Sequence, residues 1–188
     1  MIRSKIVHYS GPLGKFDYDA SVFMVGRTAF GAGVREVLKY RGNETDGSKI
    51  RIPEGITDTS HMFEGKSLVT PPVIPEGVIR ANYMFKDCAS LKEAAQFPST
   101  LRRCGFMYQN CRTLDYCPDI PRTVTHAAYM FDGCRALVSA PAIPQTLLDM
   151  KGMFRGCVNL LSLPNVDLEA ENTKHMLKGC ERLLERIV

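Results

Sequence analysis

The chain has 188 residues, of which 45% are hydrophobic and 23% charged, a composition typical of one folded domain or a compact repeat array. Its formal net charge of +4 is well below the charge expected of a dedicated DNA-binding protein. No run of about 18 apolar residues is present, so no membrane span is expected. The N-terminal residues include no apolar stretch of signal-peptide length, which favours a cytoplasmic protein. A surface or secreted protein whose signal was removed is the alternative.

Residues 1–24 do not match the pattern that follows, and we predict that they form an N-terminal cap. Within this segment, Asp17 and Asp19 flank Tyr18 and resemble an acidic metal-binding pair, but a turn is the favoured interpretation. The glycines at 26, 31 and 33 lack the rest of a phosphate-binding motif, so a loop or cap is favoured there as well.

From residue 25 onward the sequence repeats with a period of about 23 residues. Methionines recur at Met62, Met84, Met107, Met130, Met153 and Met176, in steps of 22, 23, 23, 23 and 23 residues. The residue after each methionine is Phe63, Phe85, Tyr108, Phe131, Phe154 or Leu177. Small turn-forming residues come two positions later, at Gly65, Asp87, Asn110, Gly133, Gly156 and Gly179.

Two further columns complete the pattern. The ladder cysteines are Cys88, Cys111, Cys134, Cys157 and Cys180, and the ladder leucines are Leu68, Leu91, Leu114, Leu137, Leu160 and Leu183. An Ile-Pro-like pair follows in most turns, for example Ile74-Pro75 and Ile120-Pro121. One such turn cannot bury its own apolar face, whereas stacked turns form a continuous core. The sequence therefore predicts an α/β repeat solenoid of the leucine-rich-repeat type, with residues 25–188 in the solenoid.

The prolines argue against long strands, because proline cannot donate a ladder hydrogen bond. We expect short parallel strands near the ladder leucines and irregular or short helical connections around each Met-Phe pair. Residues 25–58 are predicted to be a degenerate first turn, with Ala29-Phe30 in the Met-Phe place and residues 39–48 inserted as a surface loop. Six Met-Phe turns follow, the last of them incomplete, and Glu181, Arg182, Glu185 and Arg186 are predicted to protect the open end.

The ladder cysteines are interpreted as small core residues and not as metal ligands, because their 23-residue spacing differs from the short spacing of zinc-ligand pairs. Cys117 is also predicted to lie in the core. Cys104 follows Arg102 and Arg103, whose charges would lower its thiol pKa, so a reactive thiol is an alternative to a core residue there. We expect no metal and no cofactor.

A column of flat rings precedes the methionines, with His61 and His175 beside Tyr83, Phe106 and Tyr129. Ring packing is favoured over a metal-binding or general-base role for these histidines. No catalytic triad can be assembled from local motifs, so no enzymatic activity is expected. An enzyme within the N-terminal cap is the alternative.

Repeats of the Met-Phe-x-Gly-Cys type, over residues 25–188, resemble the BspA-like leucine-rich-repeat family of bacterial and mobile-element proteins. The resemblance implies a curved solenoid with a parallel sheet. It also implies binding roles such as adhesion and protein–protein contact.

Recognition by a solenoid uses the positions that the repeat leaves variable. The middle turns combine charge with an aromatic residue at such positions, and we predict a partner-binding site at Lys92, Glu93, Arg112, Asp115, Tyr116 and Arg135. Arg112 and Arg135 share one column and suit an acidic partner, or more weakly a nucleic-acid phosphate, while a solvated surface of mixed charge is the alternative.

The expected function is that of a binding module whose partner is a protein. Two alternatives belong to the same class of function. One is a phage or mobile-element inhibitor that occludes a host defence enzyme. The other is a bacterial surface adhesin whose signal is absent from this chain.

Overall fold

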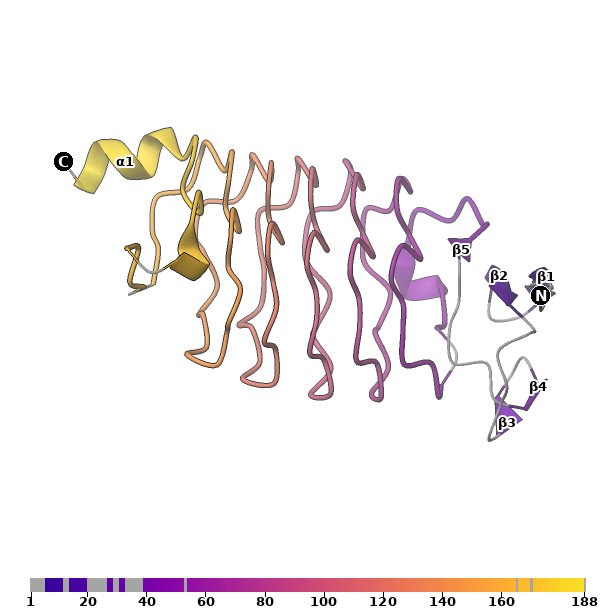
Figure 1. The fold of residues 1–188 in the computed structure, drawn as a ribbon. Helices are drawn as coiled ribbons and strands as arrows, with labels where there is room; N and C mark the ends of the chain where they lie inside the picture. The colour runs from indigo at the N-terminus through magenta and orange to yellow at the C-terminus, as the bar shows by residue number, and fades with distance from the viewer. Residues whose placement is uncertain are drawn as a thin grey trace.

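The computed structural model describes residues 6–11, 14–19, 27–28, 31–32, 39–52, 54–164, 166–169 and 171–187. From residue 39 onward the chain winds through successive turns that lie side by side in a single stack, with the N-terminal strands at one end and a helix at the other (Figure 1). Within the described residues, no helix is long and apolar enough to cross a membrane.

The N-terminal segment forms a hairpin. Strand β1 (Ile6–Gly11) pairs antiparallel with β2 (Gly14–Asp19), and β2 pairs antiparallel with β5 (Lys39–Tyr40). Strands β3 (Arg27–Thr28) and β4 (Gly31–Ala32) form a separate antiparallel pair. The turn predicted around Asp17 is therefore wrong, because the whole stretch from Lys15 to Asp19 pairs with β1. Aromatic residues alternate with polar ones in β2, a pattern that suits a strand.

Residues 39–48 do not form the predicted inserted loop. Tyr40 is buried, its ring centroid lies 5.2 Å from that of Phe63, and its backbone N–H donates to the Met62 carbonyl. Asp46 forms a parallel bridge with Thr70, and a 3-10 helix η1 (Gly47–Lys49) follows. This segment is thus part of the first turn of the stack, with Tyr40 at the place of the Phe column. The predicted place of that column, at 29–30, lies outside the described residues.

Backbone hydrogen bonds join each turn to the next. On the Met-Phe side, the N–H groups of Phe63, Phe85 and Tyr108 donate to the carbonyls of Met84, Met107 and Met130, one turn later. On the leucine side the direction reverses, since Asp115 donates to Lys92 in the preceding turn. The parallel pairing in the stack is limited to isolated bridges, including Glu93 with Tyr116 and Ser139 with Ser162.

Two positions in each of the six Met-Phe turns adopt a left-handed backbone conformation. The first directly precedes the methionine and comprises His61, Tyr83, Phe106, Tyr129, Gly152 and His175, with φ between 54° and 61°. The second, at the small turn-formers, comprises Gly65, Asp87, Asn110, Gly133, Gly156 and Gly179, with φ between 60° and 81°. A non-glycine residue pays about 1–2 kcal/mol for this conformation, so the stacked neighbours must stabilise it.

The core consists of the columns identified in the sequence. The six column methionines are at most 1% exposed, and the ladder cysteines are fully buried. The ladder leucines are fully buried except Leu183, which is 6% exposed. Five of the rings that follow the methionines stack in sequence, with centroids 5.4–5.8 Å apart from Phe63 to Phe154. The prediction that these columns point inward is confirmed.

The described chain ends in a helix that follows the last turn of the stack. A 3-10 helix η2 (Glu171–Thr173) precedes the last Met-Leu pair, and α1 (Glu181–Ile187) follows Cys180 (Figure 1). Leu183 faces the core, while Leu184 is 42% exposed and Glu181, Arg182 and Glu185 are exposed.

Candidate functional site

The six side chains predicted to bind a partner, Lys92, Glu93, Arg112, Asp115, Tyr116 and Arg135, are all exposed. They do not form one site. Asp115 and Tyr116 line a groove of about 310 Å³, whereas Arg112 and Arg135 line another of about 460 Å³. The two grooves share no lining residue.

We call the first hollow the Tyr116 groove; it is lined by residues 115–119 and 139–141. The Tyr116 side chain is 56% exposed. Its backbone is held in place because Ala94 donates to the Tyr116 carbonyl at 2.9 Å and Glu93 forms a parallel bridge with it. The Asp115 N–H donates to the Lys92 carbonyl at 2.9 Å, so the Lys92-Glu93 pair lies one turn away, beside Asp115 and Tyr116. The structure thus brings four of the six predicted residues together.

The second hollow, which we call the basic groove, runs across neighbouring turns. It is lined by three columns of the repeat. We call the column of Asn110, Gly133, Gly156 and Gly179 the floor, and the columns that flank it in the sequence the walls: Asp132, Arg155 and Lys178 on one side, and Arg112, Arg135, Val158 and Glu181 on the other. Each set comes from one column of the repeat, and the floor column lies between the two wall columns in the sequence. The sequence analysis identified the Arg112 column but not the Arg155 column, and the structure shows that both columns line one hollow.

The Asp132 carboxylate, at the basic groove, is hydrogen-bonded by other side chains of the protein. Its carboxylate accepts hydrogen bonds from Arg155 Nε at 2.9 Å, Arg155 Nη2 at 2.7 Å and Gln109 Nε2 at 2.9 Å. The hydrogen bond to Asp132 raises the pKa of Arg155, and the Arg155 guanidinium also lies 5.1 Å from the centre of the Tyr129 ring. In the described part of the chain, the side chains of Arg112 and Arg135 form no hydrogen bond or ion pair.

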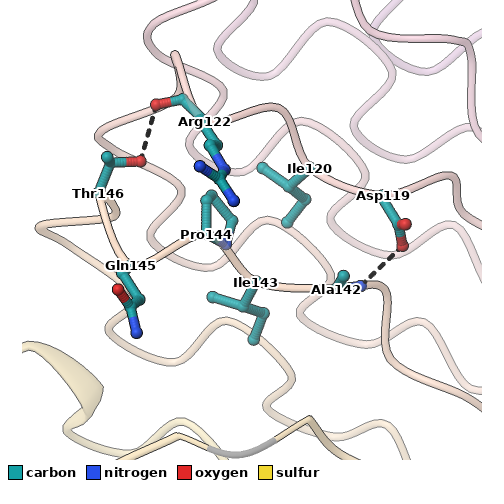
Figure 2. Close-up of a pocket in the computed structure, with 8 residues that line it drawn as sticks. All are labelled: Asp119, Ile120, Arg122, Ala142, Ile143, Pro144, Gln145 and Thr146. Atoms are coloured by element: carbon teal, nitrogen blue, oxygen red, sulfur yellow. Dashed lines mark hydrogen bonds between the residues drawn. The ribbon is translucent and has the colours of Figure 1, made fainter.

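A third hollow of about 600 Å³ lies between two neighbouring Ile-Pro segments (Figure 2). Ile120, Ile143 and Pro144 supply its apolar surface. The polar groups on its rim bond across the two turns: the Ala142 N–H donates to Asp119 Oδ1 at 3.0 Å, and Thr146 Oγ1 donates to the Arg122 carbonyl at 2.7 Å. Because these hydrogen bonds join the two turns, the polar groups that form them stabilise the stacking of the turns.

All seven cysteines are free and buried. Each ladder cysteine donates its S–H to the carbonyl of the ring-bearing residue in the preceding turn at 3.0–3.2 Å, as Cys134 does to Tyr108. Burial raises the pKa of Cys104 to about 12, whereas Arg102 and Arg103 are exposed. The alternative of a reactive Cys104 is therefore wrong, because desolvation of the thiolate decides its pKa.

The ring column before the methionines forms an outer ladder. His61 stacks on Tyr83 at 4.6 Å, Tyr83 on Phe106 at 4.7 Å and Phe106 on Tyr129 at 4.9 Å, which confirms ring packing for His61. Gly152 interrupts the ladder, and a Cβ there would lie 2.3 Å from Cε1 of Tyr129. No group of three or more His, Cys, Asp or Glu side chains suited to a metal ion occurs among the described residues.

The chain matches no protein-family model, no curated protein and no solved structure.

Proposed function

We propose that the chain is a binding module for a protein partner and has no catalytic activity, and that its stacked turns form a leucine-rich-repeat solenoid of the BspA-like kind. The observation that carries this proposal is the exposure of the Tyr116 side chain. Its side chain is 56% exposed although its backbone is fixed by hydrogen bonding and bridging to the preceding turn.

An exposed tyrosine on a fixed backbone suits an interface because its ring adds a large contact area at a small entropic cost. Charged residues of both signs surround it, with Lys92 and Glu93 in the preceding turn and Asp115 beside it. The groove next to the ring offers Pro118, Ala140 and Pro141 as apolar contacts. This combination of an aromatic anchor and a charged rim is typical of protein–protein interfaces.

The thiols support a binding role over a catalytic one. A cysteine nucleophile acts as a thiolate and requires a lowered pKa and access to substrate. Here burial raises the pKa of the cysteine side chains, among them Cys88 and Cys104, each to about 12.

The test compares two exposed apolar side chains. The immobilised wild-type chain is used to identify a partner, which is then purified and titrated against Tyr116→Ala and Leu148→Ala. Leu148 is 64% exposed and lies outside the Tyr116 groove, so it is the matched control. We expect Tyr116→Ala to weaken binding by about tenfold or more, and Leu148→Ala to leave it within about twofold of wild type.

Equal affinities for wild type and Tyr116→Ala would contradict the proposed site. Far-UV circular dichroism and the melting temperature should be unchanged in both variants, since neither side chain is part of the core.

A further inference from the structure

We propose that the basic groove binds an extended acidic peptide segment, with the carboxylates of alternate residues held by the arginines of its walls. This inference rests on the proposed binding function and assigns the chemical class of the segment that is bound. It uses a surface separate from the Tyr116 groove.

The shape of the groove suits an extended chain. Three of its four floor positions are the glycines Gly133, Gly156 and Gly179, which present backbone and no side chain between two walls that do carry side chains. Because these glycines come from successive turns, the bare floor continues along the stack. The hollow is open to solvent, and its volume of about 460 Å³ is comparable to that of small-ligand sites.

The charges of the groove select an anion. Four cationic side chains, Arg112, Arg135, Arg155 and Lys178, line it against two acidic ones, Asp132 and Glu181. Arg155 and Gln109 already satisfy Asp132, so its charge is compensated inside the protein. The remaining cations therefore outnumber the single remaining carboxylate, that of Glu181.

Arg112 and Arg135 are the strongest candidates for direct contact. They occupy the same position in successive turns, and hydrogen-bonded turns lie roughly 5 Å apart, so their side chains start close together. Neither guanidinium has a partner in the described part of the chain, and each can form a bidentate pair with a carboxylate. An acidic side chain lying between them would relieve the repulsion between two neighbouring cations.

The groove favours a peptide over a single-stranded nucleic acid. Binding of single strands uses exposed aromatic faces on which bases stack, and the residues that line this groove include no aromatic ring. The nearby Tyr129 ring is covered by the Arg155 guanidinium. The Glu181 carboxylate would also repel a continuous line of phosphates, whereas a peptide can place a neutral residue there.

The test is a fluorescence anisotropy titration of the full chain with three labelled probes. The first is a short peptide that alternates Glu and Gly, the second has Gln in place of each Glu, and the third is an oligothymidylate of the same length. We expect the Glu peptide to bind about tenfold or more tightly than the other two probes. Its affinity should fall as salt is added, because exposed charges are screened.

Three variants locate the binding. Arg135→Gln removes one wall cation and should weaken Glu-peptide binding about fivefold or more. Arg122→Gln removes the same charge from an exposed residue outside the groove and should change binding by less than about twofold. Gly156→Asn adds a neutral side chain to the floor and should also weaken binding about fivefold. Its backbone is tolerated, since Asn110 holds the same position of the repeat at φ 61°.

Binding of the Gln peptide as tight as that of the Glu peptide would overturn the proposal, and so would tighter binding of the oligothymidylate. Equal losses for Arg135→Gln and Arg122→Gln would show diffuse attraction to the whole surface and would equally overturn it. Tyr116→Ala should leave Glu-peptide binding unchanged, so failure of this inference and failure of the Tyr116 site are distinguishable.

Discussion

Single side chains in this protein fill the core and also form hydrogen bonds with the backbone. A ladder cysteine is small enough for the interior, and its S–H gives a second donor to a carbonyl that already accepts one backbone hydrogen bond; the Phe85 carbonyl, for example, accepts from Cys88 N and from Cys111 Sγ. An alanine would fit the space but would not donate. The cysteine at this position thus combines burial with polar satisfaction.

The buried thiols make the folded protein less stable at alkaline pH. Burial raises the pKa of Cys88 and Cys104 to about 12 and that of Cys180 to about 11, while an unfolded cysteine titrates near about 8.5. The folded chain therefore retains protons that the unfolded chain loses, so the free energy of unfolding is greatest below about pH 8.5 and falls as pH rises toward 12.

We expect the melting temperature, followed by circular dichroism, to decrease progressively above about pH 9. Cys104→Ala should be less stable at neutral pH but should show a shallower decrease, because one titrating group is gone. A melting temperature that stays constant between about pH 8 and 11 would show that the thiolates are not desolvated in the folded state.

At the scale of elements, the two ends of the stack adjoin different structures. At the N-terminal end, β2 pairs with β5, which begins the first described turn of the stack. At the C-terminal end, α1 buries Leu183 and exposes Glu181, Arg182, Leu184 and Glu185. Between them, the described turns contain isolated bridges, because prolines and left-handed residues interrupt any longer pairing.

The docking of α1 can be tested with two neighbouring leucines. Leu183 is 6% exposed and Leu184 is 42% exposed. Leu183→Asp should lower the free energy of unfolding by about 2 kcal/mol or more, since it removes buried apolar surface and introduces a charge. Leu184→Asp introduces the same charge in the same helix and should cost about 0.5 kcal/mol or less. Urea denaturation measures both, and equal midpoints would mean that α1 does not pack as described.

At the scale of the whole molecule, each turn contacts its immediate neighbours through hydrogen bonds and ring stacking. Within the described residues, almost every hydrogen bond between turns joins residues 21 to 26 positions apart, such as those from Phe85 to Met107 and from Cys134 to Tyr108. Stability in such an array is approximately a sum of terms for single turns and for neighbouring pairs. Coupling between mutations should therefore fall off after one turn.

Double-mutant cycles on the ladder leucines test this nearest-neighbour behaviour. Leu114→Ala and Leu137→Ala lie in adjacent turns, whereas Leu68→Ala and Leu160→Ala lie four turns apart, and all four side chains are fully buried. Each single change should cost about 2–5 kcal/mol. In urea denaturation, the distant pair should add within about 0.5 kcal/mol, and the adjacent pair should depart from additivity by more. Strong coupling of the distant pair would contradict the neighbour-only description.

The sequence by itself determined which columns are buried, because a 23-residue period places the same residue type at the same point of every turn. It also identified the column of small turn-forming residues, whose left-handed conformation the structure then showed. Both are local or periodic properties, so Leu114 and Gly133 could be interpreted without knowledge of the distances between turns.

Only the tertiary structure decided how the exposed residues combine. The hydrogen bonds between turns fix which columns border one another, and they separate Tyr116 from Arg135 while bringing Arg135 to the same groove as Arg155. They also place Tyr40 in the stack, although its Lys-Tyr pair does not match the Met-Phe columns. A repeat pattern shows which residues each turn buries against its neighbours. The contacts of exposed side chains are not part of that pattern, because they depend on how the turns are stacked.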